Sequence, residues 1–327
     1  MHLPLASVHR RTWASWSDSQ RILAVITTIG ALWAIGSLKS SNNVVGGTTA
    51  TTISKLFVDT PPCKLSPVGE PICGEPADLP CPRTLYSSRT IEQYTDWFKF
   101  HAELLESDTS TNTYYSPQLN LIGDSITESW RGTSMGGPCE RCRGIPAVRD
   151  AFFGDPAILA IAGDQTQHLL YRLQVARHLL AQQTNTDTVF VVLIGTNNLG
   201  AGYSVDATTA GIVAIVDELL NTSASNHILL LQLLPRADDS SKWKPKTLTE
   251  HGKTFQEVVD AVNAQLVAYP PLQTNERVSL VNCNKPLSNE RGTANLSLMP
   301  DGLHPNARGG KLLAQCIVDC WKEKKCG

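Results

Sequence analysis

The sequence has no excess of charge of either sign. Its 327 residues contain 28 Lys and Arg against 30 Asp and Glu, and the basic residues form no stripe. A face that binds nucleic acid needs such a stripe, so no nucleic-acid partner is expected. The chain also lacks the second block of periodic sequence that a second large domain would show. We therefore expect one large domain with an N-terminal extension, and a ligand that is neutral or small and polar.

Long runs without charge are scarce, but one covers residues 22–38 and reads ILAVITTIGALWAIGSL. It is slightly shorter than the about 20 residues of a comfortable membrane span. Arg10, Arg11 and Arg21 precede it and predict a transmembrane signal-anchor whose short basic tail, residues 1–21, stays in the cytosol. This single-pass type II arrangement puts the rest of the chain in a secretory lumen or outside the cell. The small residues at 34–36 leave open a cleaved signal peptide and a secreted protein, and a transit peptide is a further alternative.

Methionine is rare, with three residues, whereas cysteine is frequent, with nine. The cysteines are Cys63, Cys73, Cys81, Cys139, Cys142, Cys283, Cys316, Cys320 and Cys326. In an oxidising compartment most of them would form disulfides, although their pairing cannot be read from the sequence and the odd count leaves one thiol free or paired between chains. The CxxC spacing of Cys139 and Cys142 also suggests a metal or redox motif, but no second CxxC follows at zinc spacing, so a structural disulfide is favoured and no metal is expected. Sequons at Asn221 and Asn295 are compatible with a lumenal glycoprotein.

Residues 39–85 are rich in Ser, Thr, Gly and Pro and predict a stalk, which leaves residues 86–327 as the domain. Apolar runs predict buried strands at residues 119–122, 157–162, 188–194, 227–234 and 278–281. Helical patterns occur at residues 91–105, 165–181, 207–220, 249–268 and 307–322. Strands with little polar alternation, separated by helices, are typical of a parallel sheet that is covered on both faces. The sequence therefore predicts a three-layer α/β/α domain with about five parallel strands.

Three of these strands are followed directly by polar or glycine residues. Ser125 follows the first strand in the segment Gly-Asp-Ser, Gly163 follows the second in Gly-Asp, and Asn197 follows the third in Gly-Thr-Asn-Asn. Ligands of parallel sheets bind at the carboxyl ends of the strands, so these residues are expected at one site. Taken alone, each has an ordinary explanation: a helix N-cap, a tight turn or a capping asparagine.

The fourth segment, near the C-terminus, holds an acid–base pair. His304 stands three residues after Asp301 in a loop bounded by glycine and proline. A serine hydroxyl becomes a nucleophile only when a base removes its proton, and a histidine oriented by a carboxylate is such a base for Ser125. The backbone N–H groups of Ser125 and Gly163 and the amide of Asn197 are the candidate donors to an oxyanion. The histidines at 101, 168, 178 and 251 lie in helical patterns and are interpreted as packing or surface residues.

With these four segments in this order, the chain resembles the SGNH (GDSL-type) hydrolase superfamily from about Tyr94 to Ile317. Within it the chain is most similar to the catalytic-subunit branch of intracellular platelet-activating factor acetylhydrolase. The segments that carry this similarity are Gly163–Leu173, Gly195–Asn198, Leu233–Arg236 and Leu303–His304.

The resemblance implies a flavodoxin-like fold and hydrolysis of a small ester, often an acetyl ester, without a metal or organic cofactor. It implies that Ser125 is the nucleophile and that Asp301 and His304 complete the triad. Gly163 and Asn197 would complete the oxyanion hole. Two further residues at positions of the same segments, Asp124 and Thr196, are interpreted as supports for the loops.

The chain differs from that intracellular branch in its apolar segment, its cysteine-rich stalk and an insertion at Gly132–Gly144 that contains the CxxC. A secretory location favours O-acetyl groups on glycans as substrates, with lipid acetyl esters as the other class. Two alternatives remain: an O-acyltransferase that uses the same triad, and a non-catalytic glycan-binding protein on the same fold. The loop Ala237–Thr249, with Trp243, is interpreted as an ordinary solvated loop, with the border of the substrate pocket as the alternative. The oligomeric state is not predicted.

Overall fold

The computed structural model describes residues 64–65, 71–72, 77–84, 90–110, 119–176, 188–237 and 253–323. The predicted cytosolic tail, the apolar segment at residues 22–38, most of the stalk and most of the loop at residues 237–249 lie outside these residues. So do Cys63, Cys73 and Cys326, and the end of the helical pattern at residues 165–181. Among the helices described, none is both long enough and apolar enough to cross a membrane.

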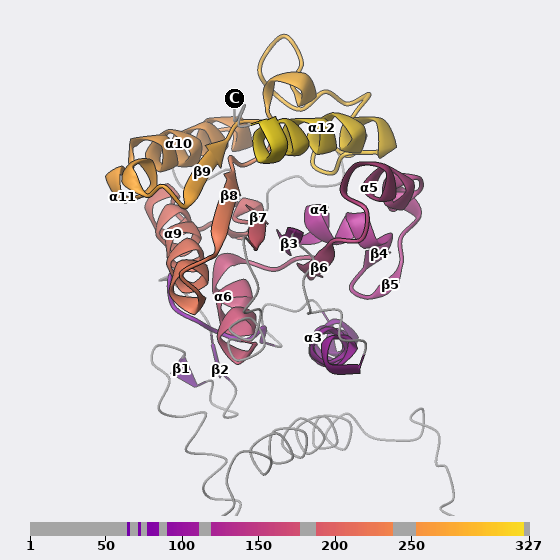
Figure 1. The fold of residues 1–327 in the computed structure, drawn as a ribbon, viewed down its shortest axis with the longest axis vertical. Coiled ribbons are helices and arrows are strands. Elements are labelled where there is room, and N and C mark those ends of the chain that lie inside the picture. Colours follow the sequence, from indigo (N-terminus) through magenta and orange to yellow (C-terminus); the bar gives the residue numbers. More distant parts are fainter. Residues whose placement is uncertain are drawn as a thin grey trace, which may run out of the picture.

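A five-stranded parallel sheet forms the centre of the domain, in the order β6-β3-β7-β8-β9 (Figure 1). Its strands are β3 (Leu119–Gly123), β6 (Ala157–Ala160), β7 (Val189–Leu193), β8 (His227–Leu231) and β9 (Val278–Val281). Every residue of β3 and β7 is buried, because both faces of these central strands are covered. The strands pair in parallel in register, with Gly123 of β3 opposite Ala160 of β6 and Leu193 of β7. The predicted five-stranded parallel sheet and the flavodoxin-like fold are confirmed.

Helices cover the sheet on both sides (Figure 1). α5 packs against α12, and α6, α9 and α10 pack one against the next. The longer helices are α3 (Ile91–Ser110), α5 (Ile145–Phe153), α6 (Thr166–Val175), α9 (Val205–Thr222), α10 (Phe255–Ala268) and α12 (Ala307–Glu323). Three short helices complete the set: α4 (Ser125–Glu128), α8 (Thr196–Gly200) and α11 (Pro270–Thr274).

Local capping explains where several helices begin. Ser204 precedes α9 and accepts a hydrogen bond from the N–H of Ala207. Thr254 and Glu257 form a capping box at the start of α10, each side chain accepting from the other residue's backbone N–H. The predicted start of this helix at residue 249 therefore lies before the capping residues, and residues 249–252 are not described.

The insertion at Gly132–Gly144 forms a small hairpin of β4 (Thr133–Ser134) and β5 (Gly137–Pro138), followed by one turn of 3₁₀ helix at Glu140–Cys142. Met135, at the tip of the hairpin, has φ 54°, a left-handed conformation that is unusual for a residue other than glycine. Its sulfur accepts a hydrogen bond from Arg83 at 3.4 Å. The insertion is thus held by contacts with distant segments.

Residues 77–84, which the sequence places in the stalk, pack on α6. Ala77 is fully buried, and its carbonyl accepts a hydrogen bond from the Thr166 hydroxyl at 2.9 Å. The N–H of Cys81 donates to the carbonyl of Gln167 at 3.0 Å. This part of the predicted stalk therefore belongs to the packed body of the protein.

Two disulfides lie within the described residues, Cys139–Cys142 and Cys283–Cys316. The same ranges contain no free thiol. The CxxC motif therefore forms a disulfide, as the favoured interpretation of the sequence holds. Cys283–Cys316 joins the segment after β9 to α12 and closes a loop with a sequence separation of 33 residues.

Replacing Cys283 and Cys316 together by Ala should lower the free energy of unfolding by about 4 kcal/mol, because the cross-link removes the loop-closure entropy of the unfolded chain. The matched variant Cys139→Ala with Cys142→Ala opens a loop of separation 3 and should lose only about 2 kcal/mol in the same entropy relation. Urea unfolding of both double variants measures the difference. An equal loss in the two would contradict the chain-entropy explanation.

Candidate active site

The Gly123-Asp124-Ser125 turn joins β3 to α4 at the carboxyl edge of the sheet. A Cβ on Gly123 would lie 2.2 Å from the carbonyl oxygen of Leu193, so only glycine fits between the neighbouring strand and α4. Asp124 is the N-cap, and its carboxylate accepts from the N–H of Ile126 at 3.0 Å. Ser125 is thereby the first residue of α4, with 7% of its surface exposed.

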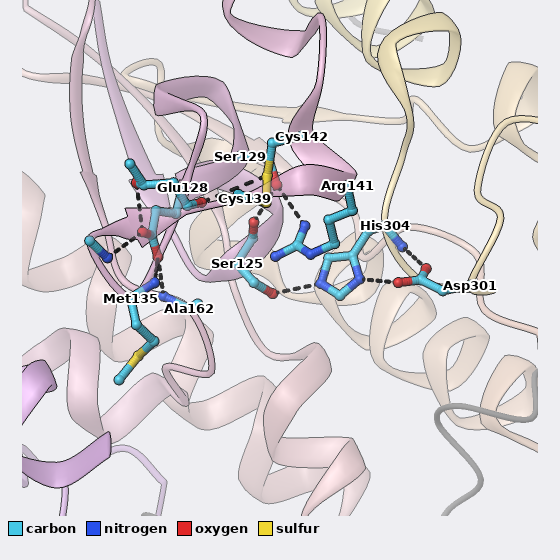
Figure 2. The surroundings of a disulfide bond; sticks show 12 residues. Ser125, Glu128, Ser129, Met135, Cys139, Arg141, Cys142, Ala162, Asp301 and His304 are labelled. Carbon is cyan, nitrogen blue, oxygen red and sulfur yellow. Dashed lines mark hydrogen bonds and ion pairs between the residues drawn. A yellow bond between two sulfur atoms is a disulfide. The ribbon is translucent and has the colours of Figure 1, made fainter. Parts of the chain in front are cut away.

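The loop after the C-terminal strand brings a histidine to Ser125. One carboxylate oxygen of Asp301 accepts from the N–H groups of Leu303 and His304, at 3.0 and 2.8 Å, and fixes the turn. The other lies 2.7 Å from Nδ1 of His304. Nε2 of His304 lies 2.9 Å from the Ser125 hydroxyl, 179 positions away in the chain. Figure 2 shows the three side chains in one continuous series, which is the juxtaposition that the sequence predicts.

The charge states of the pair follow from this geometry. Burial lowers the pKa of His304 below its usual 6.5, and the cations of Arg141 and Arg236 act in the same direction, against the hydrogen bond with Asp301. Burial alone would raise the pKa of Asp301, but the hydrogen bonds from His304 and Leu303 hold it well below its usual 3.8. At neutral pH the imidazole is therefore neutral beside an ionised carboxylate, with Nδ1–H donating to Asp301 and the Nε2 lone pair facing the serine.

Gly163 and Asn197 lie beyond the ends of β6 and β7, on either side of this turn. Gly163 has φ 80°, and a Cβ there would lie 2.5 Å from a guanidinium nitrogen of Arg83, so the position needs glycine for both reasons. The Asn197 amide donates to the carbonyl of Asp164 at 2.9 Å and lies 3.3 Å from the Asp124 carboxylate. These contacts tie the ends of β3, β6 and β7 to one another.

Asp124 and Thr196 occupy supporting positions in the structure. Asp124 is fully buried, and burial raises its pKa to about 7. The carbonyl and the hydroxyl of Thr196 accept from Arg236, at 2.9 and 3.1 Å, and the Arg236 guanidinium lies over the ring of Phe255 with 3.7 Å to its centroid. The backbone N–H of Ala237 donates to the carbonyl of Gly302, which connects this segment to the Asp301 loop.

A buried network around Asp164 was not predicted from the sequence. Asp164 is fully buried and accepts from the indole N–H of Trp97 at 2.7 Å and from the guanidinium of Arg172 at 2.8 Å. Arg83 donates to the carbonyl of Ala162 at 3.0 Å. The Gly-Asp pair and Arg172 both lie in a segment that the resemblance marks, whereas Trp97 and Arg83 carry no signal in the sequence that links them to the site.

Glu128, at the end of α4, was also not predicted. It is fully buried and accepts four hydrogen bonds, from the backbone N–H groups of Met135, Gly136 and Ala162 and from the Thr133 hydroxyl. The bond from Ala162 is 2.6 Å long and fixes the residue next to Gly163. Glu128 therefore joins α4, the hairpin and the Gly163 turn.

His101 and His168 are buried packing residues of α3 and α6, as expected. In the ranges that the structure covers, no three His, Cys, Asp or Glu side chains are grouped so that they could hold a metal ion.

A serine, a histidine and an aspartate in a hydrogen-bonded series at the carboxyl edge of a parallel α/β sheet are typical of hydrolases with a serine nucleophile. The chain belongs to the GDSL-like lipase/acylhydrolase family, which matches residues 121–312, and so to the SGNH hydrolase superfamily. It is an esterase.

Curated relatives and solved structures agree with this assignment. The platelet-activating factor acetylhydrolase IB subunit alpha1 of Homo sapiens is 28% identical over 196 residues, which are 59% of this chain and 70% of that protein. The orthologue of Bos taurus gives the same identity and coverage. A GDSL-like lipase of Bacteroides thetaiotaomicron shares the fold, with a TM-score of 0.51 and 18% identity over 68% of this chain and 98% of that one.

Replacing Glu128 by Gln should lower the free energy of unfolding by about 3 kcal/mol, because an amide NH₂ would face buried donors that now bind a carboxylate oxygen. Glu140→Gln is the matched control: its carboxylate is 84% exposed and pairs only with Arg143 at 2.5 Å, a surface pair worth about 0–1 kcal/mol. Denaturant unfolding of both variants tests this. Losses of the same size would show that Glu128 is not a structural centre of the site.

Proposed function

We propose that the protein is a serine esterase that removes a short acyl group, acetyl in the first place, from a hydroxyl group. Ser125 acts as nucleophile, His304 as general base and then general acid, and Asp301 orients the imidazole. The observation that carries this proposal is the unbroken series from the Ser125 hydroxyl to Nε2 of His304 at 2.9 Å, and from Nδ1 to Asp301 at 2.7 Å.

In the first half of the reaction Ser125 Oγ forms a bond to the carbonyl carbon of the ester, and its proton moves to Nε2 of His304. When the tetrahedral intermediate collapses, the bond to the alcohol oxygen breaks and His304 gives that oxygen the proton. Water then attacks the acyl-serine while His304 takes its proton, and collapse returns the proton to Ser125 and releases the acid. Asp301 stays ionised and stabilises each imidazolium.

We assign the negative oxygen of the intermediate to the backbone N–H groups of Ser125 and Gly163 and to the amide of Asn197. Gly163 suits this role by its place beyond the end of β6, in a turn whose φ of 80° glycine adopts readily. The Asn197 amide donates to the Asp164 carbonyl at 2.9 Å and to the Asp124 carboxylate at 3.3 Å, and the longer contact is the weaker one. An oxyanion can compete with Asp124 for the amide hydrogen. Each such donor contributes about 2.7–4 kcal/mol to transition-state stabilisation.

The substrate class that we propose is an O-acetyl group on a glycan or a lipid. The curated relatives are named acetylhydrolases, which supports a small acyl group. The disulfides support an oxidising compartment, and with the basic, apolar N-terminal sequence they favour a type II anchored protein with a lumenal or extracellular domain.

Ser125→Ala in the full chain should lower kcat/KM for p-nitrophenyl acetate by at least about 10⁴-fold without unfolding the protein, because the nucleophile is lost. Ser225→Ala, before β8 at the opposite end of the sheet, is the control and should keep its activity. Comparing acetate, butyrate and octanoate esters ranks the acyl length, and product analysis with an added glycan acceptor separates hydrolysis from acyl transfer. Full turnover by the Ser125 variant would overturn the proposal.

The activity of the wild type should fall in acid with a midpoint below 6.5. His304 accepts the serine proton only when neutral, and since its folded-state pKa is lowered, it stays neutral to a lower pH than an ordinary histidine. Asp301 remains ionised throughout this range because its pKa is held low. The pH profile of kcat/KM measures the midpoint, with circular dichroism to verify folding at each pH. A flat profile, or a midpoint above 6.5, would contradict this role of His304.

A further inference from the structure

The loop closed by Cys139–Cys142 and the residue after it carry three charged side chains, and they do not point the same way. Glu140 and Arg143 are 84% and 81% exposed and form an ion pair with each other at 2.5 Å. Arg141 instead turns inward and is only partly exposed. Figure 2 shows its guanidinium between the disulfide and the imidazole of His304, beside Ser125.

Among the described residues Arg141 makes one hydrogen bond, from Nη1 to the Ser129 hydroxyl at 2.9 Å. Ser129 in turn donates to the carbonyl of Ser125 at 2.7 Å. A guanidinium has five N–H donors in a planar fork, so most of the binding capacity of Arg141 is not used by this contact. Within the described ranges it forms no ion pair.

Three carboxylates act electrostatically on Arg141, and all three already accept hydrogen bonds from other groups. Asp301 binds His304, Glu128 holds four hydrogen bonds and Asp124 caps α4. A cation beside His304 also opposes the imidazolium that forms during catalysis. Burial lowers the pKa of Arg141, and an anion brought by the substrate would oppose this effect.

We propose that Arg141 binds an anionic group of the substrate, a carboxylate or a phosphate, on the alcohol part of the ester. This deepens the proposed function and rests on it. The alcohol part is singled out because His304 must reach the leaving oxygen to protonate it, and Arg141 lies on the His304 side of Ser125 (Figure 2). The acyl oxygen faces the donors that we assign to the oxyanion, the N–H groups of Ser125 and Gly163 and the amide of Asn197.

The loop is built to hold Arg141 in place. Cys142 is 1% exposed and packs in the main core. A Cβ on Gly144, which has φ 80°, would lie 3.2 Å from Cβ of Ala307 at the start of α12. A cation fixed by a disulfide and by close packing loses little further freedom when it binds, and this pre-organisation favours affinity.

The test uses the oxidised full chain at about pH 8, where the histidine is neutral in every variant. Two pairs of acetyl esters are compared: acetylated methyl glucuronide with acetylated methyl glucoside, and acetylglycerol phosphate with acetylglycerol. In the wild type, kcat/KM should be about ten- to a hundredfold higher for the anionic member of at least one pair, the effect of a charged hydrogen bond. The pair that responds identifies the anion as the carboxylate of an acidic sugar or the phosphate of a lipid headgroup.

Arg141→Gln should remove at least tenfold of that preference, and Arg141→Lys, which keeps the charge but not the fork, should retain part of it. The matched control is Arg143→Gln. It removes the same charge two residues further along the chain, from a side chain that is 81% exposed, and its preference should equal that of the wild type. Equal rates for both members of both pairs in the wild type would overturn the proposal. So would a preference that survives in Arg141→Gln.

Labelling of Ser125 by a fluorophosphonate separates this proposal from the proposed function. If Ser125 is not labelled, the serine esterase mechanism fails, whatever Arg141 does. If it is labelled, methyl glucuronide or glycerol phosphate should slow labelling of the wild type more than that of Arg141→Gln. Equal protection of the two proteins would show that Arg141 binds no anion while leaving the reactive serine established.

Discussion

The carboxylate of Asp164 is fully buried and accepts from the indole of Trp97 and the guanidinium of Arg172, while its own backbone carbonyl accepts from Asn197. A buried charge is tolerated only when it is paired and hydrogen-bonded, so these partners cannot move independently. Because Gly163 immediately precedes Asp164, the network fixes the turn that faces the serine. α3, α6 and the end of β7 are thus tied to one point of the site.

Glu128 fixes the chain on the other side of Gly163, because its carboxylate accepts a hydrogen bond from the N–H of Ala162. The glycine turn is consequently held between two buried carboxylates that come from different segments. Glu128 also closes the hairpin that leads to the Cys139–Cys142 loop, so α4, the Gly163 turn and Arg141 share one support. Enzymes of this type depend on donors that are already in place when charge develops, and this arrangement provides such rigidity.

The five strands could be predicted because each is an apolar run, as burial on both faces requires. Ser125, Gly163 and Asn197 could be placed together because parallel strands end at a common edge. The hairpin of the insertion could not be predicted, since two-residue strands have no periodicity and Met135, with φ 54°, contacts Arg83 and Glu128 from other segments. Glu128 itself looks like a surface residue in the sequence Ser-Ile-Thr-Glu, because nothing local indicates that four donors from distant segments surround it.

Residues 77–84 set a lower limit on how short a functional version of this protein can be. The Arg83 guanidinium donates hydrogen bonds to the carbonyl of Ala162 and to the sulfur of Met135. Ala77 and Cys81 are hydrogen-bonded to residues of α6. The composition of the sequence predicts a domain boundary at residue 86. A fragment that starts there would lack Arg83, whose guanidinium lies beside Gly163. Proteolytic release with a cut before Ala77 therefore leaves these contacts in the domain, whereas a cut at residue 86 removes them.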